Sequence, residues 1–269
     1  MQRPLVMGIV NLTPDSFSGD GVVSDVRRAI AHAKFQVEMG ADILDIGAES
    51  SRPGALPTPE DEELRRLLPV LREAVTWGIP LSVDTYKPAV MEAALDAGAS
   101  MINDIRALSD PKALRIVSQS NCAVCLMHMQ GSPSSMQDSP VYDKVACEVS
   151  AYLQMALARC MDAGIAGDRI VLDPGFGFGK KLEHNMQLFR SLGKPIWGGQ
   201  PLLVGLSRKS MLGEITGRPV GERMLASVTA AVLAAQRGAA IIRVHDVAET
   251  REALKVFSVL RDEEEVDES

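Results

Sequence analysis

The sequence predicts a single-domain α/β protein with the (β/α)8 architecture of a TIM barrel. Its length of 269 residues is usual for one closed barrel of this kind. Short apolar segments alternate with longer amphipathic ones, which is the pattern of parallel strands joined by helices. Hydrophobic residues make up 46% of the chain, so there is enough apolar side-chain material for a large core.

Eight apolar segments have the length and composition of buried parallel strands. In chain order they are 4–10 (PLVMGIV), 41–47 (ADILDIG), 79–84 (IPLSVD), 100–105 (SMINDI), 123–127 (AVCLM), 169–174 (RIVLDP), 201–207 (PLLVGLS) and 239–245 (AAIIRVH). The helical patterns between them include Asp25–Glu38, Glu60–Thr76, Lys87–Asp96, Pro111–Ser118, Tyr142–Asp162 and Gly221–Arg237. We place the barrel at residues 1–261 and an acidic, frayed tail at residues 262–269.

A repeated layout places polar side chains at the same depth in three of the predicted strands. In each copy a glycine ends a helix, an apolar strand follows, and the fifth residue after the glycine is polar. The copies begin at Gly40, Gly98 and Gly238, and their polar residues are Asp45, Asn103 and Arg243. Because active sites of this fold lie at the C-terminal ends of the strands, the repeat points to that end of the barrel.

Polar residues also follow the other five predicted strands. They are Asn11, Asp84, His128, Asp173 and Ser207. Any one of them, taken alone, is more often a capping or turn residue than a functional one. Their arrival at one rim of the barrel, however, favours a binding or catalytic site there.

The charge distribution argues against a nucleic-acid partner. The formal net charge is −7, but six acidic residues lie within residues 262–269, so the rest of the chain carries a net charge of −1. A nearly neutral body has no basic stripe for a phosphate backbone, and it does not repel a small anion. We therefore expect small-molecule substrates and no nucleic acid.

Cysteine usage and hydropathy indicate a cytoplasmic protein without a membrane segment. The first apolar run, Leu5–Val10, is too short for a signal-peptide core, and no stretch approaches the roughly 18 apolar residues of a membrane helix. Four cysteines in a chain of this length do not form a disulfide framework. Cys122 and Cys125 form a C-x-x-C motif, but they fall at a predicted strand without a second ligand pair, so buried thiols are favoured over a metal site.

The glycine-rich segment 175–180 (GFGFGK) does not match a nucleotide-binding loop. It has neither the G-x-G-x-x-G spacing nor the four-residue gap of a G-x-x-x-x-G-K-[ST] loop. We interpret it as a mobile loop after the sixth strand that presents Phe178 as an aromatic wall beside Asp173. The alternative is an ordinary strand-to-helix turn with a surface phenylalanine.

Seven short motifs are spread along the whole chain. They lie at 11–18 (NLTPDSFS), 49–54 (ESSRPG), 83–85 (VDT), 102–104 (IND), 172–177 (LDPGFG), 205–210 (GLSRKS) and 243–245 (RVH). Taken together, they resemble the signatures of the dihydropteroate synthase family of pterin-binding barrels, and the resemblance runs from about residue 5 to residue 260. Two positions depart from the family pattern. Ser51 stands where threonine is usual. In the first loop the usual Asp-Gly order is reversed as Gly19-Asp20, and this change bears on how the loop closes.

The resemblance implies a transferase of folate biosynthesis that is a target of sulfonamides. Its members condense 6-hydroxymethyl-7,8-dihydropterin diphosphate with 4-aminobenzoate, giving 7,8-dihydropteroate and diphosphate. Loss of diphosphate leaves a methylene cation on the electron-rich pterin, so the substitution is dissociative and needs no covalent intermediate with the protein. Such a cation needs electrostatic support rather than a nucleophile.

The pterin site follows from the chemistry of the ring and from the resemblance. A pterin's pyrimidine edge carries N–H donors beside a carbonyl, which suits a carboxylate, an amide and a cation. Asp173, Asn103 and Lys209 are residues of those types. The resemblance implies that they bind this edge and that Arg243 stacks on the ring; the full set for the pterin is Asp84, Asn103, Asp173, Lys209, Arg243, Met127 and Gly205. Without the resemblance, Lys209 is better explained as a surface lysine at a helix start.

The resemblance also assigns the remaining site residues. The residues with catalytic roles are Asp84, Lys209, Arg243 and Arg52. The diphosphate contacts are Asn11, Arg52, Arg243 and His245, with Asn11 also the ligand of a Mg²⁺ cofactor. The 4-aminobenzoate contacts are Phe17, Ser51, Arg52, Pro53, Phe178, Lys209 and Ser210, the last because it begins a helix whose N-terminus favours a carboxylate.

Two other functions are compatible with a pterin-binding barrel. A silent paralogue would hold a pterin without synthesising dihydropteroate, although Asn11, Arg52, Lys209 and His245 argue against it. A pterin-dependent methyltransferase acting on a corrinoid is disfavoured, because it has no use for the loop Ser51-Arg52-Pro53-Gly54. Homodimers are common in the family, and the alanine-rich helix Leu225–Ala235 is a candidate contact.

Overall fold

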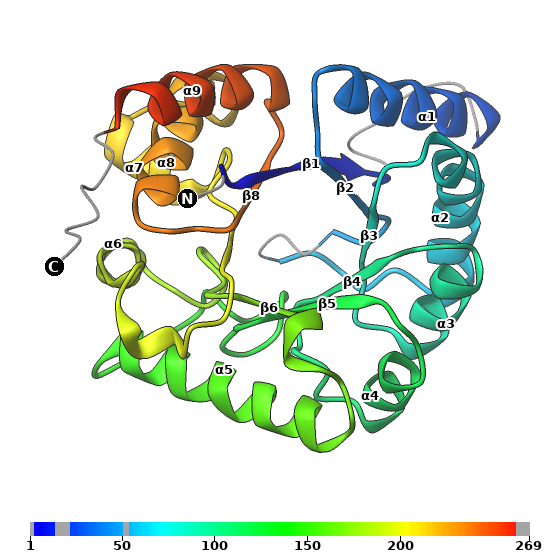
Figure 1. Ribbon diagram of the computed structural model, residues 1–269, viewed down its shortest axis with the longest axis horizontal. Coiled ribbons are helices and arrows are strands. Elements are labelled where there is room, and N and C mark those ends of the chain that lie inside the picture. The colour runs from blue at the N-terminus through cyan, green and yellow to red at the C-terminus, as the bar shows by residue number, and fades with distance from the viewer. Residues whose placement is uncertain (1–2, 14–21, 51–53, 262–269) are drawn as a thin grey trace, which may run out of the picture.

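The chain forms a parallel β-barrel surrounded by a ring of helices (Figure 1). The structure is a computed structural model, and it describes residues 3–13, 22–50 and 54–261. The predicted single-domain (β/α)8 fold is confirmed. The tail at 262–269 lies outside the described residues.

All eight predicted strands are present. They are β1 (Leu5–Asn11), β2 (Ile43–Gly47), β3 (Leu81–Asp84), β4 (Met101–Asp104), β5 (Ala123–Met127), β6 (Ile170–Asp173), β7 (Leu203–Val204) and β8 (Ile241–Val244). The order in the sheet is β6-β5-β4-β3-β2-β1-β8-β7, and every strand pair is parallel. The ring closes where the Leu172 N–H donates to the Pro201 carbonyl at 3.0 Å and Leu172 bridges Leu202.

The helices cover the outer surface of the barrel and differ from the predictions mainly at their ends. They are α1 (Val22–Glu38), α2 (Glu60–Ala74), α3 (Pro88–Asp96), α4 (Pro111–Ser118), α5 (Val145–Asp162), α6 (Leu182–Ser191), α7 (Ser210–Thr216), α8 (Met224–Gln236) and α9 (Val247–Leu260). After α2 the chain continues as a short 3-10 turn, and Gly78 ends it with a left-handed φ of 71°. The predicted Tyr142–Asp162 and Gly221–Arg237 helices each begin three residues later than expected.

Two layers of side chains fill the barrel interior. The lower layer is apolar and consists of Met7, Ile43, Met101, Cys125, Leu203 and Ile241. Alternate residues of a strand point to the same side, so the residues two positions further along face inward above this layer. In β2, β4 and β8 those residues are Asp45, Asn103 and Arg243. The repeat in the sequence therefore places three polar side chains on an apolar floor.

Two predictions from composition can be compared with the fold. Cys122, Cys125 and Cys160 are buried free thiols and Cys147 is an exposed one, so the C-x-x-C motif forms no disulfide. Across residues 3–13, 22–50 and 54–261, the helices lack the combination of length and apolar character that crossing a bilayer requires.

Candidate active site

Two carboxylates and one guanidinium occupy the centre of the polar layer. Arg243 of β8 donates from Nε to Asp45 Oδ2 at 2.6 Å and from Nη2 to Asp84 Oδ2 at 3.0 Å. Asp45 is completely buried in β2, whereas Asp84 stands at the end of β3 and is partly exposed. The arginine thus joins three strands at the mouth of the barrel and fixes both acidic groups.

Asn103 completes this network and leaves acceptors open. Its Nδ2 donates to Asp45 Oδ2 at 3.2 Å. Asp45 Oδ1 and Asn103 Oδ1 are buried and have no hydrogen-bond partner within the described residues. Buried acceptors without partners cost free energy, and a ligand that donates hydrogen bonds removes that cost. The site is therefore suited to a donor-rich ligand.

Asp173 and Lys209 are two further charged groups of the site. Asp173 ends β6, and its Oδ1 accepts the N–H of Gly175 at 2.7 Å. Lys209 is the residue before α7, and its Nζ donates to the carbonyl oxygen of Phe176. The positive charge of Lys209 acts on Asp173, whose side chain is buried. These two groups supply the carboxylate and the cation expected for the edge of a pterin.

Gly205 and Met127 are placed beside these charged groups. A Cβ atom at Gly205 would lie 3.7 Å from Arg243 Cβ and 3.9 Å from Lys209 Nζ, so this glycine leaves space between the two cations. Met127 ends β5 and pairs in register with Asp173 of β6. Both residues therefore lie close to the charged groups, and their contact with the pterin stays a prediction.

Burial raises the pKa values of acidic groups in the site and lowers that of its lysine. Burial, together with the Asp45 carboxylate, raises the pKa of Asp84 to about 7. Burial lowers the pKa of Lys209 to about 8, against the attraction of Asp173. Burial also raises the pKa of Asp173 despite the nearby Lys209. Although burial opposes it, Asp45 and Asp84 raise the pKa of Arg243, which therefore stays charged.

The rim of the barrel carries Asn11 and His245, two of the residues expected at the diphosphate. Asn11 ends β1 and is half-buried. His245 follows β8, and its Nδ1 lies 2.9 Å from Ser207 Oγ, while Gln36 Nε2 donates to its carbonyl oxygen at 3.0 Å. Within the described part of the chain, no group of three or more His, Cys, Asp or Glu residues is arranged to hold a metal ion.

The predicted arylamine residues divide into two groups. Phe178 lies in the loop after β6, with its ring centroid 4.8 Å from Lys209 Nζ. Ser210 is the first residue of α7 and is exposed. The remaining predictions lie outside the described residues: Phe17, Ser51, Arg52 and Pro53.

The glycine-rich loop 175–179 is held by contacts along its length, in contrast to the mobile loop that we expected. Gly177 donates its N–H to Asn185 Oδ1 at 2.9 Å, and its carbonyl accepts from Gln137 Nε2 at 2.5 Å. Gly175 has a φ of 69°, and a Cβ atom there would lie 1.9 Å from the His128 carbonyl oxygen. Glycine is therefore required at 175 for both conformation and space.

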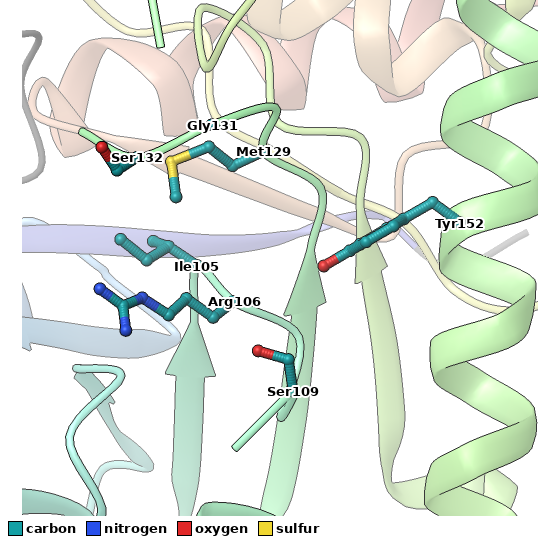
Figure 2. Close-up of a pocket in the computed structure, with 7 residues that line it drawn as sticks. All are labelled: Ile105, Arg106, Ser109, Met129, Gly131, Ser132 and Tyr152. Atoms are coloured by element: carbon teal, nitrogen blue, oxygen red, sulfur yellow. The ribbon is translucent and has the colours of Figure 1, made fainter. Parts of the chain in front are cut away.

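A separate cavity of about 210 Å³ lies beside the barrel mouth (Figure 2). Its walls come from the loops after β4 and β5 and from Tyr152 of α5, whose hydroxyl points into it. The lining residues are Ile105, Arg106, Ser109, Met129, Gly131, Ser132 and Tyr152. None of them belongs to the charged network, so this cavity is distinct from the site described above.

Sequence reasoning gave no role to three buried polar residues near the site. Asp45 appeared in the repeat but received no role, although it binds both Arg243 and Asn103. Lys180 and His128 are hydrogen-bonded to each other beneath the loop after β6. The repeat was the available signal for Asp45, whereas no local pattern pairs Lys180 with a histidine 52 positions earlier.

Comparison with known proteins agrees with this geometry. The family described as pterin binding enzyme matches residues 7–245. A dihydropteroate synthase of Neisseria meningitidis serogroup B is 50% identical over 267 residues, which cover 97% of this chain and 94% of that protein. These matches define the class of the molecule as a pterin-binding barrel enzyme.

Solved structures narrow the class further. A Xanthomonas albilineans dihydropteroate synthase with 4-aminobenzoic acid is 50% identical with a TM-score of 0.91, covering 96% of this chain and 93% of that one. A Burkholderia cenocepacia dihydropteroate synthase complexed with 7,8-dihydropteroate is 46% identical with a TM-score of 0.87, covering 97% and 92%. The chain belongs to the dihydropteroate synthase family of transferases.

Proposed function

We propose that the chain condenses 6-hydroxymethyl-7,8-dihydropterin diphosphate with 4-aminobenzoate, releasing 7,8-dihydropteroate and diphosphate in folate biosynthesis. One observation carries this proposal. Three carboxylates, an amide and two cations lie at one end of the barrel, and two buried acceptors there have no partner among the described residues. Family membership supports the same reaction, because relatives of this chain are dihydropteroate synthases.

The pterin is held by its polar edge. Asp173 accepts hydrogen bonds from the ring N–H groups, and the unpaired Asn103 Oδ1 accepts another. Lys209 donates to the ring carbonyl. Arg243 lies against the ring face, with its guanidinium fixed by Asp45 and Asp84. A planar cation held on two sides loses little entropy when the ring stacks on it.

Charged residues assist the departure of diphosphate at both ends of the C–O bond that breaks. The Asp84 carboxylate stabilises the positive charge that develops on the pterin methylene group. Arg243, His245 and Arg52 stabilise the diphosphate as it accumulates negative charge. The C–O bond breaks with its electron pair going to diphosphate, and the amine nitrogen of the second substrate then forms the C–N bond and loses a proton.

Magnesium is proposed as the cofactor, with Asn11 as its protein ligand. The described residues offer no cluster of three or more acidic, histidine or cysteine side chains for a metal ion. This fits Mg²⁺, which usually retains waters and binds substrate phosphates together with one or two protein oxygens. When bound, the ion neutralises diphosphate charge.

The arylamine is placed on the solvent side of the pterin. Phe178 contacts its ring, and Lys209 and the N–H of Ser210 meet its carboxylate. Phe17, Ser51, Arg52 and Pro53, which lie outside the described residues, are proposed as its further contacts. Because the second substrate binds against the first, we propose that the pterin diphosphate binds first.

A single coupled assay tests the reaction. Diphosphate release is followed with Mg²⁺ and with each substrate alone or both together. The synthase releases diphosphate only when both substrates are present. A silent paralogue binds the pterin and releases none, and a corrinoid methyltransferase turns over only with a methylated pterin and a corrinoid acceptor. Loss of activity on removal of Mg²⁺ with EDTA, and recovery on its return, tests the cofactor.

We further propose that the enzyme acts in the cytoplasm as a homodimer. Four free thiols, three of them buried, suit a reducing compartment. Exposed apolar side chains gather on the neighbouring helices α7, α8 and α9 and the turn between α7 and α8; they include Ile215, Val220, Met224, Leu225, Val256, Val259 and Leu260. A patch of this kind on a folded surface is typical of an interface.

A further inference from the structure

Lys180 is a buried lysine that none of the proposed substrate contacts uses. Its side chain is 3% exposed. Its Nζ lies 2.9 Å from His128 Nδ1, 2.8 Å from the Gly175 carbonyl oxygen and 3.0 Å from the Phe178 carbonyl oxygen. Three acceptors match the three N–H groups of an ammonium ion. No donor is left for a substrate, which separates Lys180 from the phosphate-binding lysine of a nucleotide loop.

The contacts of Lys180 fix the loop 175–179 at two points. Two other carbonyl groups of the loop accept hydrogen bonds from side chains outside it. Tyr142 donates its hydroxyl hydrogen to the Gly179 carbonyl at 2.9 Å, and Gln137 donates to the Gly177 carbonyl at 2.5 Å. With Lys209 on the Phe176 carbonyl, every carbonyl oxygen from 175 to 179 accepts a side-chain hydrogen bond. The loop shape is therefore set by side chains rather than by regular backbone structure.

Three residues of this loop lie against Lys209. The Phe176 carbonyl accepts a hydrogen bond from Lys209 Nζ, and the Phe178 ring lies 4.8 Å from the same atom. A Cβ atom at Gly177 would lie 3.4 Å from Lys209 Cδ, so the loop backbone passes directly beside the lysine stem. A displaced loop therefore displaces both the ammonium group and the aromatic wall of the arylamine pocket.

We propose that Lys180, supported by His128, is a positioning residue of the synthase site. It holds the loop 175–179 so that the Phe176 carbonyl and the Phe178 ring orient Lys209 between the two substrates. This inference rests on the proposed function, because that function assigns Lys209 and Phe178 to substrate binding. Its effect falls mainly on the arylamine, since Asp173 and Asn103 belong to strands β6 and β4 rather than to the loop itself.

The groups around Lys180 favour its ammonium form, and burial opposes it. Burial, together with the charge of Lys180, lowers the pKa of His128 to about 3, so the imidazole stays neutral and its Nδ1 accepts the hydrogen bond. Burial lowers the pKa of Lys180 to about 7, and the carboxylate of Asp173 opposes this shift. The His128 ring is held edge-on to Tyr152 with a centroid distance of 4.9 Å.

The test compares Lys180→Met with Lys194→Met, which replaces an exposed lysine after α6. Steady-state assays give kcat and the KM of each substrate, and calorimetry gives Tm and the pterin affinity. We expect Lys180→Met to raise the KM of the arylamine about tenfold. It should also change the pH at which the rate falls on the alkaline side. Its pterin affinity should stay within about threefold of wild type. Lys194→Met should match wild type. Unchanged kinetic parameters in Lys180→Met, with only a lower Tm, would overturn the proposal.

A second pair of variants applies if Lys180→Met does not fold. In His128→Asn the amide oxygen replaces Nδ1 as acceptor, whereas His128→Leu removes the acceptor. We expect His128→Leu to raise the KM of the arylamine severalfold and His128→Asn to reverse most of that rise. Equal KM values in the two variants would overturn the proposal. Failure of wild type to release diphosphate with both substrates would instead refute the proposed function.

Discussion

At the scale of single residues, an acidic and a basic side chain of the site have similar pKa values. Burial raises the pKa of Asp84 to about 7 and lowers that of Lys209 to about 8. Shifts of this size in a cleft are typical of catalytic sites, and here they arise because burial disfavours the charged form of each group. Ionic Asp84 and Lys209 therefore coexist only within a narrow range of pH.

This range predicts a bell-shaped pH profile. Below about pH 7 Asp84 takes up a proton and no longer stabilises a cation, so kcat/KM for the pterin diphosphate should fall about tenfold per pH unit. Above about pH 8 Lys209 loses its proton and the same parameter should fall again. Steady-state rates measured from pH 5 to 10 check both limbs.

Two variants test whether Asp84 causes the fall in rate at low pH, which is the acidic limb of the profile. Asp84→Asn should retain pterin binding, lower kcat, and show no acidic limb. Asp96→Asn, at an exposed carboxylate that ends α3, should keep the wild-type profile. An acidic limb that persists unchanged in Asp84→Asn would assign it to another group.

Asp173 gives a second prediction at this scale. Asp173→Ala should weaken pterin binding by about 1 to 3 kcal/mol or more, because it leaves buried N–H donors of the ring without an acceptor. Isothermal titration with the pterin measures the change. Asp168→Asn, at the opposite end of β6 and exposed to solvent, is the matched control. Equal affinities in the two variants would remove Asp173 from the pterin site.

At the scale of elements, buried lysines stabilise connections that have no regular structure. Lys87, which precedes α3, donates to Glu49 in the connection after β2, to the Thr58 carbonyl and to Glu63 of α2. Glu49 also accepts the N–H of Thr58 at 2.8 Å. These contacts join the two ends of the connection between β2 and α2, which carries the predicted residues 51–53.

Removing this lysine should destabilise the fold. Lys87→Met leaves two carboxylates, Glu49 and Glu63, buried without a cation, which costs about 3 to 5 kcal/mol. For a protein of this size, that loss lowers Tm by roughly 6 to 20 °C in scanning calorimetry. Adding Glu63→Gln to Lys87→Met should recover part of the loss. Lys112→Met, at an exposed site on α4, should leave Tm unchanged, and equal Tm values for Lys87→Met and Lys112→Met would contradict the assignment.

Sequence patterns predicted the strands better than the connections. Each strand is a buried apolar run, so its own composition identifies it, and all eight are confirmed. The Lys87 cluster and the contacts of loop 175–179 join side chains that are 24 to 52 positions apart. No periodicity encodes such contacts, and the glycines at 175, 177 and 179 suggested motion where the surrounding side chains fix the loop.

At the scale of the whole molecule, the barrel explains why distant residues share one site. An apolar layer that includes Met7, Met101 and Ile241 fills the lower barrel and excludes water below the charged groups. The inward alternation of each strand then places acidic, amide and cationic groups on this floor at the C-terminal end. The repeat and the polar strand ends made this end predictable, but the pairing of Asp45 with Arg243 follows only from barrel closure.

The outer surface of the molecule predicts its oligomeric state. Leu225 on α8 is 76% exposed and Val259 on α9 is 75% exposed, and these helices lie side by side (Figure 1). Contact between two copies removes this apolar surface from water. Light scattering after size exclusion should give twice the 28.9 kDa mass of one chain.

Surface charge tests where the copies meet. Leu225→Glu and Val259→Glu should each yield a folded protein with the mass of one chain, because a charge in an apolar interface is desolvated without a partner. Met155→Glu changes another exposed apolar residue, 64% accessible, on α5 across the barrel, so this variant should remain a dimer. If wild type has the mass of one chain, or if Met155→Glu dissociates it as effectively, the copies do not associate through α8 and α9.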